Sequence, residues 1–278
     1  MRRGRSSTRS CSRALTLRKI LGAIVVLVLG SAAMAQSVAL PPAGGQYDSQ
    51  LGGAYEPPAG TVIVSRDRAD PAAPGLYNIC YINAFQTQPQ ETDWWLANHA
   101  DLLLRQYGEL AEDLNWPGEI LLDTSTDAKR AGLAAIVGSW IQQCARDGYD
   151  AIEADNLDTY SRSDGALSID DNLRYVAALV EKAHGLGLAF GQKNGGELAD
   201  RGKAVGLDFA IVESCQVYEE CEGYTEVFGA HVLEIEYTDT DERYFNEACT
   251  VRGSKISVIR RDRNLTIPRK PSYFYKTC

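Results

Sequence analysis

The stretch GYDAIEADNLDTY, residues 148–160, runs from an apolar segment directly into a cluster of acidic side chains. Its apolar start suits a buried strand, and carboxylates follow at Glu153, Asp155 and Asp158. Carboxylates this close together repel one another, and each loses hydration when it is half buried. A core strand that ends in this way therefore favours a chemical role for the strand end.

Short apolar runs of this kind recur eight times along the chain. They are TVIV (61–64), YNICYI (77–82), EILL (119–122), DAIE (150–153), LAFG (188–191), DFAIV (208–212), HVLEI (231–235) and ISVI (256–259). Helical patterns lie between most of them, as in residues 127–148 and in residues 168–187, where Ser168 is a candidate N-cap. Eight strands alternating with helices predict an α/β fold with a parallel sheet. At this length we expect a (β/α)₈ TIM barrel rather than an open doubly wound sheet.

The N-terminal 35 residues have the pattern of a signal peptide. Seven Arg or Lys residues precede Ile20, an apolar run follows, and the small residues Ala33 and Ala35 suit cleavage after Ala35. The apolar run is shorter than the roughly 20 residues that favour a membrane span, although an uncleaved N-terminal anchor is the alternative. We therefore expect a secreted protein without a stable membrane anchor. Residues 36–60, rich in Gly, Pro and Ala, are expected to be a linker or extended arm, and residues 61–278 a single domain.

The net charge of the chain limits its partners. The full sequence has 28 basic and 37 acidic residues, and removal of the seven leader bases leaves 21 against 37, a net charge of −16. This charge disfavours nucleic acid and anionic membranes and favours a cationic partner. Solubility alone is the alternative explanation.

Six cysteines remain after the leader, an even number that is typical of disulfides in an oxidising compartment. Six cysteines allow 15 connectivities. Cys215 and Cys221 are close enough to close a local loop, and Cys249 with Cys278 would fix the C-terminus. The pair that remains is Cys80 with Cys144. The sequence has no C-x-x-C pair and no histidines at i, i+4 that would indicate a zinc site. We therefore expect no metal and no cofactor.

Polar side chains, many of them acidic, end most of the predicted strands. In chain order they are Arg66 and Asp67; Tyr81 and Asn83; Asp123; Glu153, Asp155, Asn156 and Asp158; Gln192, Lys193 and Asn194; Glu213; Glu234, Glu236 and Tyr237; Arg260, Arg261 and Asp262. The carboxyl ends of barrel strands meet at one mouth, where active sites lie. Paired carboxylates with few histidines fit glycoside hydrolysis. The alternative is that Glu153 or Asp155 only forms an ion pair with Lys193 that closes the mouth.

Several motifs resemble glycoside hydrolase family 114, the endo-α-1,4-polygalactosaminidases. They are NICYINAF, NWPGEILLD, GYDAIEADNLDTY, GQKNGGEL, DFAIVESCQVYEEC and LEIEYT, and the resemblance covers about residues 60–278. It implies a (β/α)₈ barrel that cleaves α-1,4-linked galactosamine polymers. It also implies Asp155 as the nucleophile and Glu213 as the acid/base, with a retaining outcome. We expect Asp155 to be ionised and Glu213 to be protonated, its pKa raised by the apolar lead-in and the nearby acids.

The resemblance and the strand ends together give a set of candidate sugar-binding residues. They are Tyr81, Asp123, Glu153, Asn156, Asp158, Lys193, Asn194, Tyr218, Glu236 and Tyr237. The sequence departs from the family pattern at Ala154, where Pro is usual, at Gly195, where Asp is usual, and around Glu213, where VESC replaces the commoner Asn-Glu-Gln-Cys.

The expected partner is a cationic galactosamine polysaccharide, bound by a monomer. A non-catalytic polysaccharide-binding barrel and a hydrolase of another glycan are the alternatives, since a fold does not fix a substrate.

Overall fold

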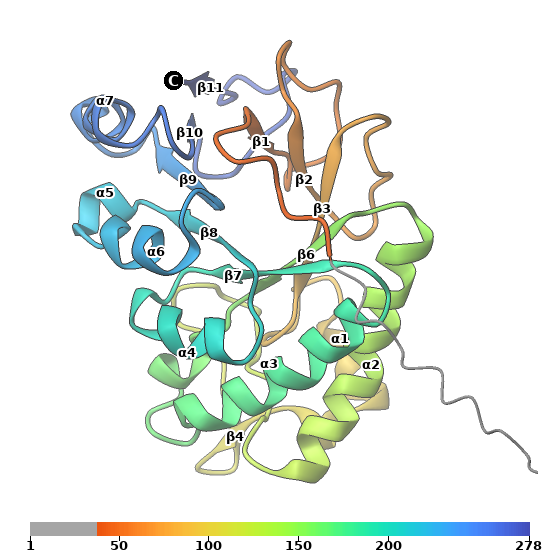
Figure 1. Ribbon diagram of the computed structural model, residues 1–278. Helices are drawn as coiled ribbons and strands as arrows, with labels where there is room; N and C mark the ends of the chain where they lie inside the picture. The colour runs from red at the N-terminus through yellow and green to blue at the C-terminus, as the bar shows by residue number, and fades with distance from the viewer. Residues whose placement is uncertain (1–37) are drawn as a thin grey trace, which may run out of the picture. The chain divides into compact units, whose positions relative to one another are not determined.

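The computed structural model describes residues 38–278, so the predicted signal peptide lies outside the described residues. Within the described part of the chain, no helix is long and apolar enough to cross a membrane. Residues 38–278 form a nine-stranded sheet with helices packed around it (Figure 1). In sheet order the strands are β1 (Tyr47–Ser49), β2 (Ile63–Asp67), β3 (Tyr77–Asn83), β6 (Ala151–Asp155), β7 (Ala189–Lys193), β8 (Phe209–Glu213), β9 (Val232–Tyr237), β10 (Ser257–Arg261) and β11 (Tyr275–Thr277).

Strands β1 to β10 of this sheet are parallel, and β11 pairs antiparallel with β10. The predicted TIM barrel is confirmed, although two of its details differ. The segment expected to be a linker or an extended arm contributes β1, which is fully buried. The prediction of a barrel strand at residues 119–122 is wrong: these residues form isolated antiparallel bridges with Gln86, Leu103 and Glu112. A run of four apolar residues fits a buried loop as well as a strand.

Side chains bridge the two edges of the sheet and nearly close the ring. Tyr275 in β11 donates its hydroxyl to the backbone oxygen of Tyr47 in β1, at 2.9 Å. The buried Arg261 guanidinium pairs with Asp48 at 2.6 Å and also donates to the backbone oxygen of Ser49. A buried charge is tolerated only when it is paired and hydrogen-bonded, and the aligned acceptors of β1 meet that need.

The helices follow the strands in chain order. The α-helices are α1 (Thr92–Asn98), α2 (Asp127–Arg146), α3 (Ile169–His184), α4 (Ala199–Ala204), α5 (Cys215–Tyr218), α6 (Cys221–Phe228) and α7 (Glu242–Val251), and the 3₁₀ turns are η1 (Ala100–Leu102), η2 (Thr159–Arg162) and η3 (Gly196–Leu198). A small hairpin of β4 (Arg105–Gln106) and β5 (Glu109–Leu110) lies between η1 and α2. The predicted start of α3 is confirmed, because Ser168 and Asp171 form a reciprocal capping box.

The alternation of side chains along the strands decides which groups reach the barrel interior. In β8, Phe209 and Ile211 belong to the inner core, whereas Ala210 and Val212 pack in the outer core toward the helices. Successive side chains point to opposite faces, so Glu213 follows Ile211 on the inner face at the carboxyl end. The same count places Glu153, Asp155, Lys193 and Tyr237 on the inner faces of their strands and Glu234 and Glu236 on the outer face of β9.

All three expected disulfides are present. Cys80 in β3 is bonded to Cys144 in α2, Cys215 to Cys221, and Cys249 in α7 to Cys278. The first ties the barrel wall to its covering helix, the second closes the loop directly after Glu213, and the third fixes the C-terminus. Each removes conformational freedom from the unfolded chain.

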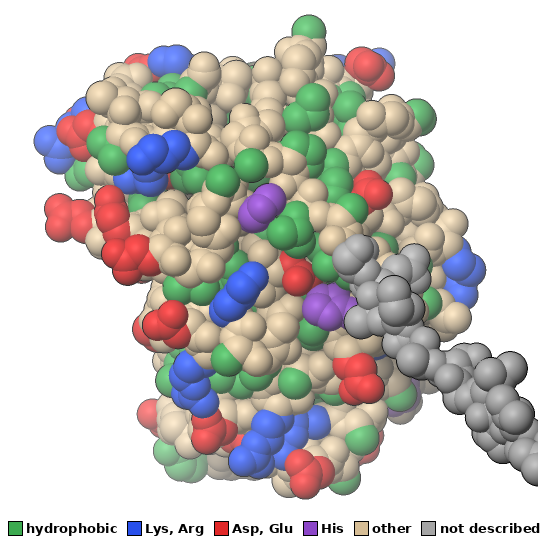
Figure 2. Space-filling model, viewed as in Figure 1, with side chains coloured by type: hydrophobic (Ala, Val, Ile, Leu, Met, Phe, Trp, Pro, Cys, Tyr) green, Lys and Arg blue, Asp and Glu red, His purple; other side chains and the backbone are tan. Residues whose placement is uncertain are grey.

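Charges of both signs are interspersed on the face shown in Figure 2, rather than gathered into one patch. The net negative charge of the chain therefore does not form an acidic surface on this side.

Candidate active site

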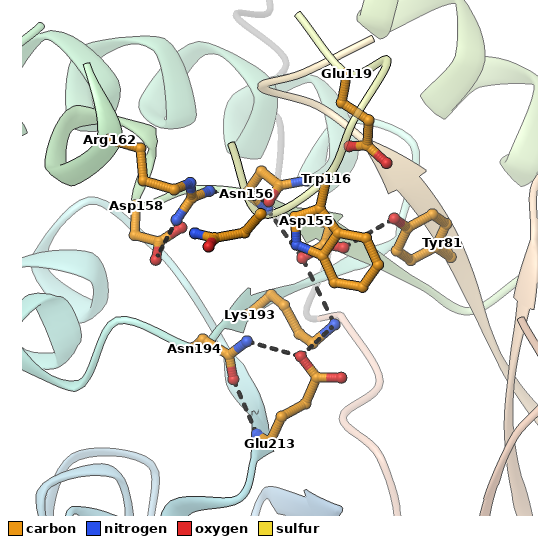
Figure 3. Close-up of a pocket in the computed structure, with 11 residues that line it drawn as sticks. Tyr81, Trp116, Glu119, Asp155, Asn156, Asp158, Arg162, Lys193, Asn194 and Glu213 are labelled. Carbon is orange, nitrogen blue, oxygen red and sulfur yellow. Dashed lines mark hydrogen bonds and ion pairs between the residues drawn. The ribbon is translucent and has the colours of Figure 1, made fainter. Parts of the chain in front are cut away.

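A pocket of about 180 Å³ opens at the carboxyl ends of the barrel strands. Its lining comes from the ends of β3, β6, β7 and β8 and from the loops after β5 and β6 (Figure 3). The lining residues are Tyr81, Asn115, Trp116, Glu119, Asp155, Asn156, Asp158, Arg162, Lys193, Asn194 and Glu213. In barrel folds this end carries the chemistry.

Lys193 holds three carboxylates around one buried ammonium group. Its Nζ lies 3.3 Å from Glu153 Oε1, 3.5 Å from Asp155 Oδ1 and 3.4 Å from Glu213 Oε2. The Lys193 side chain is only 4% exposed, and Glu153 lies beneath it with a hydrogen bond from Ser65 at 2.7 Å. Asp155 and Glu213 remain partly exposed toward the pocket. Two carboxylates thus face the cavity while the third fixes the lysine from below.

Asp155 is held by donors on both sides. Tyr81 donates its hydroxyl to Asp155 Oδ2 at 2.8 Å, and the backbone N–H of Asn156 donates to Oδ1 at 2.9 Å. Asn156 has a φ of +65°, a left-handed conformation that asparagine adopts more readily than most residues. Its side chain donates to Asn83 and accepts from Arg162, each at 3.0 Å. These contacts fix the direction of the Asp155 carboxylate.

Glu213 is held by a matching set of donors. Asn194 at the end of β7 donates to Glu213 Oε2 at 2.8 Å and accepts the backbone N–H of Glu213 at 2.9 Å. Tyr237 donates its hydroxyl to Glu213 Oε1. Asn194 also has a positive φ, +50°. The strands β7, β8 and β9 therefore all contribute to the position of one carboxylate.

The two carboxylates that face the pocket lie close enough to act on one bond. Asp155 and Glu213 each place an oxygen about 3.5 Å from the same Lys193 nitrogen, so these oxygens lie within about 7 Å of each other. A retaining glycosidase needs about 5–5.5 Å between its carboxyl groups, and an inverting one about 6.5–9.5 Å. This limit on one pair of oxygens is compatible with the retaining spacing.

The expectation that Glu213 has a raised pKa is wrong. Burial acts to raise the pKa of Glu213, but the Lys193 ammonium and the hydrogen bonds from Tyr237 and Asn194 outweigh it and lower the pKa below its ordinary value. Burial raises the pKa of Glu153. Burial also acts to lower the pKa of Lys193, but the neighbouring carboxylates hold that pKa well above its ordinary value. The unliganded site therefore keeps Lys193 and Glu213 charged.

The structure brings most of the predicted site residues together. Seven of them line the pocket: Tyr81, Asp155, Asn156, Asp158, Lys193, Asn194 and Glu213. Glu153 and Tyr237 lie behind these groups and contact them, and Tyr218 lines an adjoining pocket. Asp123 and Glu236 do not line the pocket. Asp123 accepts from Ser125 and Lys129, and Glu236 is buried on the outer face of β9, where it accepts from the backbone of Gln216.

Four residues of the pocket lining lie outside the predicted set: Asn115, Trp116, Glu119 and Arg162. Trp116 is 55% exposed, and Arg162 pairs with Asp158 at 2.8 Å and Asp113 at 2.7 Å. Glu119 accepts from Asn83 at 3.0 Å, and burial, with added repulsion from Asp155 and Asp113, raises its pKa to about 7. The segment NWPGE, residues 115–119, carries three of these four. It forms a loop, whereas the sequence pattern predicted a strand from residue 119 onward.

The chain matches the model of glycoside-hydrolase family GH114 over residues 29–278. The chain belongs to family GH114. It is therefore a glycoside hydrolase, as the motifs at the strand ends indicated. No curated protein matches the chain.

Solved structures share the barrel fold of this chain. Ega3 of Aspergillus fumigatus, solved in complex with galactosamine, has a TM-score of 0.69 and 22% identity, over 87% of this chain and 98% of Ega3. The glycoside hydrolase domain of PelA from Pseudomonas aeruginosa has a TM-score of 0.58 and 14% identity, over 80% of this chain and 96% of that domain. At these identities the likeness establishes the fold.

The described residues offer one grouping of potential metal-ligand atoms, formed by Cys215, Cys221 and Glu234. Both sulfurs in it belong to a disulfide, so neither is a thiolate. Metal binding by cysteine needs the thiolate. The grouping therefore does not have the chemistry of a metal centre.

Proposed function

We propose that the protein is a secreted endo-glycosidase that hydrolyses α-1,4-linked galactosamine polysaccharide by a retaining two-carboxylate mechanism. The observation that carries the mechanism is the pair of pocket-facing carboxylates, Asp155 and Glu213, held on one lysine within about 7 Å. The substrate class is supported by family GH114, by the galactosamine bound to Ega3 and by the net charge of −16 that follows leader removal. Three disulfides support an oxidising compartment.

In the first step, the Asp155 carboxylate attacks the anomeric carbon and the bond from that carbon to the bridging oxygen breaks. Glu213 gives its proton to that oxygen, and the leaving chain departs as an alcohol. In the second step, ionised Glu213 takes a proton from water, the hydroxide attacks the anomeric carbon, and the bond to Asp155 breaks. The donors Tyr81 and Asn156 orient the nucleophile, and Asn194 orients the acid/base.

The lowered pKa of Glu213 sets the pH dependence of this reaction. The acid form of Glu213 is needed in the first step, and its fraction falls as pH rises above the lowered pKa. We therefore expect kcat/KM to be highest on the acidic side of neutrality and to fall at higher pH. Polymer binding with no release of reducing ends at any pH would contradict the proposed reaction.

The substrate proposal is tested by incubating the mature chain with α-1,4-galactosamine polymers of graded acetylation and measuring new reducing ends. We expect turnover of the deacetylated polymer to fall as salt rises, because salt screens the attraction between exposed charges beyond about 10 Å at 0.1 M ionic strength. A fully acetylated polymer is the neutral control, and its turnover should change little with salt. The same salt dependence for both polymers would contradict an electrostatic role for the acidic charge.

Glu119 is the competing candidate for the acid, because it lines the same pocket and has a pKa of about 7. We expect Glu119→Gln to lower kcat/KM by less than about tenfold, since a general acid contributes about 10²–10⁴-fold. Glu213→Gln, measured alongside under the same conditions, is the matched comparison. If Glu119→Gln abolishes turnover and Glu213→Gln does not, the acid is Glu119.

A further inference from the structure

A second pocket, of about 350 Å³, adjoins the first on the far side of Glu213. Asp158, Asn194 and Glu213 line both pockets, whereas Asp155 lines only the first. The second pocket is also lined by residues of the short η3 turn and of the segment directly after β8. The two cavities therefore adjoin at Glu213, and Asp155 belongs to the first of them.

Two acidic side chains border this second pocket, and one of them, Glu197, accepts a hydrogen bond from the Tyr160 hydroxyl. Glu197 and Glu220 line it, and neither forms an ion pair with any cation of residues 38–278. Burial, and then repulsion from Glu197, raise the pKa of Glu220, so these two carboxylates act on each other. Ser214 also lines the pocket, is 3% exposed, and its hydroxyl has no hydrogen-bond partner among the described residues. A buried hydroxyl without a partner is costly, so a ligand that satisfies it would be favoured.

The remaining lining groups leave room for a sugar. The ring of Tyr218 is 71% exposed at the edge of the pocket, a position suited to stacking on a pyranose face. Arg263 is the cation of the pocket, but Asp239 neutralises it with two hydrogen bonds of 2.9 Å. Gly195 and Ser214, which also line the pocket, are small residues.

We infer that this second pocket is the subsite for the leaving-group sugar, and that it selects a galactosamine unit with a free amine. The inference rests on the proposed function and deepens it. The reacting sugar must contact the nucleophile, and Asp155 belongs to the first pocket alone. The acid/base must reach the bridging oxygen between two sugars, and Glu213 lies at the boundary of both pockets. The carboxylates of Glu197 and Glu220 then receive the ammonium group of the leaving sugar.

The test uses a partly N-acetylated α-1,4-galactosamine polymer and sequences the product ends by mass spectrometry. Hydrolysis turns the sugar from the first pocket into a new reducing end and the sugar from the second pocket into a new non-reducing end. The wild type should give free-amine sugars at the new non-reducing ends. In the double variant Glu197→Gln/Glu220→Gln, we expect the preference for free-amine sugars at the new non-reducing ends to fall by about fivefold to tenfold. A change of this size corresponds to the loss of two partly exposed ion pairs. The preference at the new reducing ends should be unchanged.

The control variant Glu219→Gln/Glu226→Gln removes two charges from exposed residues that do not line the pocket, and its end preferences should match the wild type. The assignment of the subsite would be overturned if the preference for free-amine sugars in Glu197→Gln/Glu220→Gln falls equally at both new ends. It would also be overturned if that preference does not fall at the new non-reducing ends. Absence of any cleavage by the wild type would instead overturn the proposed function. These failures are therefore distinguishable in one experiment.

Discussion

Replacing Asp155 by Asn or Glu213 by Gln is expected to remove nearly all turnover while leaving the fold intact. Loss of a nucleophile lowers kcat by about 10⁴-fold or more, and loss of a general acid by about 10²–10⁴-fold. Both substitutions keep the size of the side chain, and the hydrogen bonds from Tyr81 to Asp155 and from Asn194 to Glu213 can go to the remaining amide oxygen. Polymer binding should survive in both variants, measured by calorimetry beside the reducing-end assay.

Strands β6 and β8, which end in Asp155 and Glu213, supply matched controls at their opposite ends. Asp150 directly precedes β6 and accepts the backbone N–H of Asn78 at 2.8 Å, and Asp208 directly precedes β8 and accepts that of Phe190 at 2.8 Å. Asp150→Asn and Asp208→Asn each remove one acidic charge at the amino-terminal ends of the strands, where barrel residues contribute to stability rather than to catalysis. We expect them to lower thermal stability and to leave kcat/KM near the wild-type value. Near-normal turnover in either pocket variant would contradict the assignment.

Azide separates the roles of the two carboxylates on a substrate with an activated leaving group. In Asp155→Ala, azide should enter in place of the missing nucleophile and give a glycosyl azide of configuration opposite to the α substrate. In Glu213→Ala, azide should attack the sugar already bonded to Asp155, so the product keeps the α configuration. The configuration of each azide, read by NMR, decides between this assignment and its reverse.

Much of this site could be predicted because strand periodicity fixes direction as well as position. Counting by two from the apolar residues of β6 and β8 places Asp155 and Glu213 on the inner face. The same count along β9 from Leu233 and Ile235 points Glu236 outward, so strand periodicity indicates that Glu236 does not bind the sugar. Asp123 was included among the sugar-binding residues because residues 119–122 were interpreted as a barrel strand, which they are not.

Other features depend on tertiary structure and leave no local signal. Strand β1 has only three residues in a segment rich in Gly and Pro, and its Asp48 pairs with the buried Arg261, over 200 residues away. Trp116 enters the pocket from a loop without periodicity. The lowered pKa of Glu213 depends on where the end of a flexible lysine side chain lies, and the apolar residues around Glu213 indicated the opposite direction.

Replacing Lys193 by Met should have the largest effect on stability, because it removes a cation that contacts Glu153, Asp155 and Glu213 together. Methionine fills a similar volume but carries no charge. Breaking a buried ion pair by removing one partner costs about 3–5 kcal/mol. We expect a loss of this size in the free energy of urea unfolding at pH 8. The control Lys276→Met removes a partly exposed lysine that pairs with the half-exposed Glu242, and should cost less than about 1 kcal/mol.

The pH dependence of this loss identifies its cause. In the wild type, Glu213 has a lowered pKa, so its contribution to stability is present above its unfolded pKa and is lost as pH falls. In Lys193→Met, burial without a cation raises the carboxyl pKa values, so the folded variant binds more protons than its unfolded chain and gains stability as pH falls. The difference between wild type and variant should therefore shrink from pH 8 to pH 5. Any turnover that remains should fall off at a higher pH than in the wild type, because more Glu213 stays protonated. A stability loss that is constant with pH would mean that Lys193 acts through packing, and Glu213 would then need another cause for its lowered pKa.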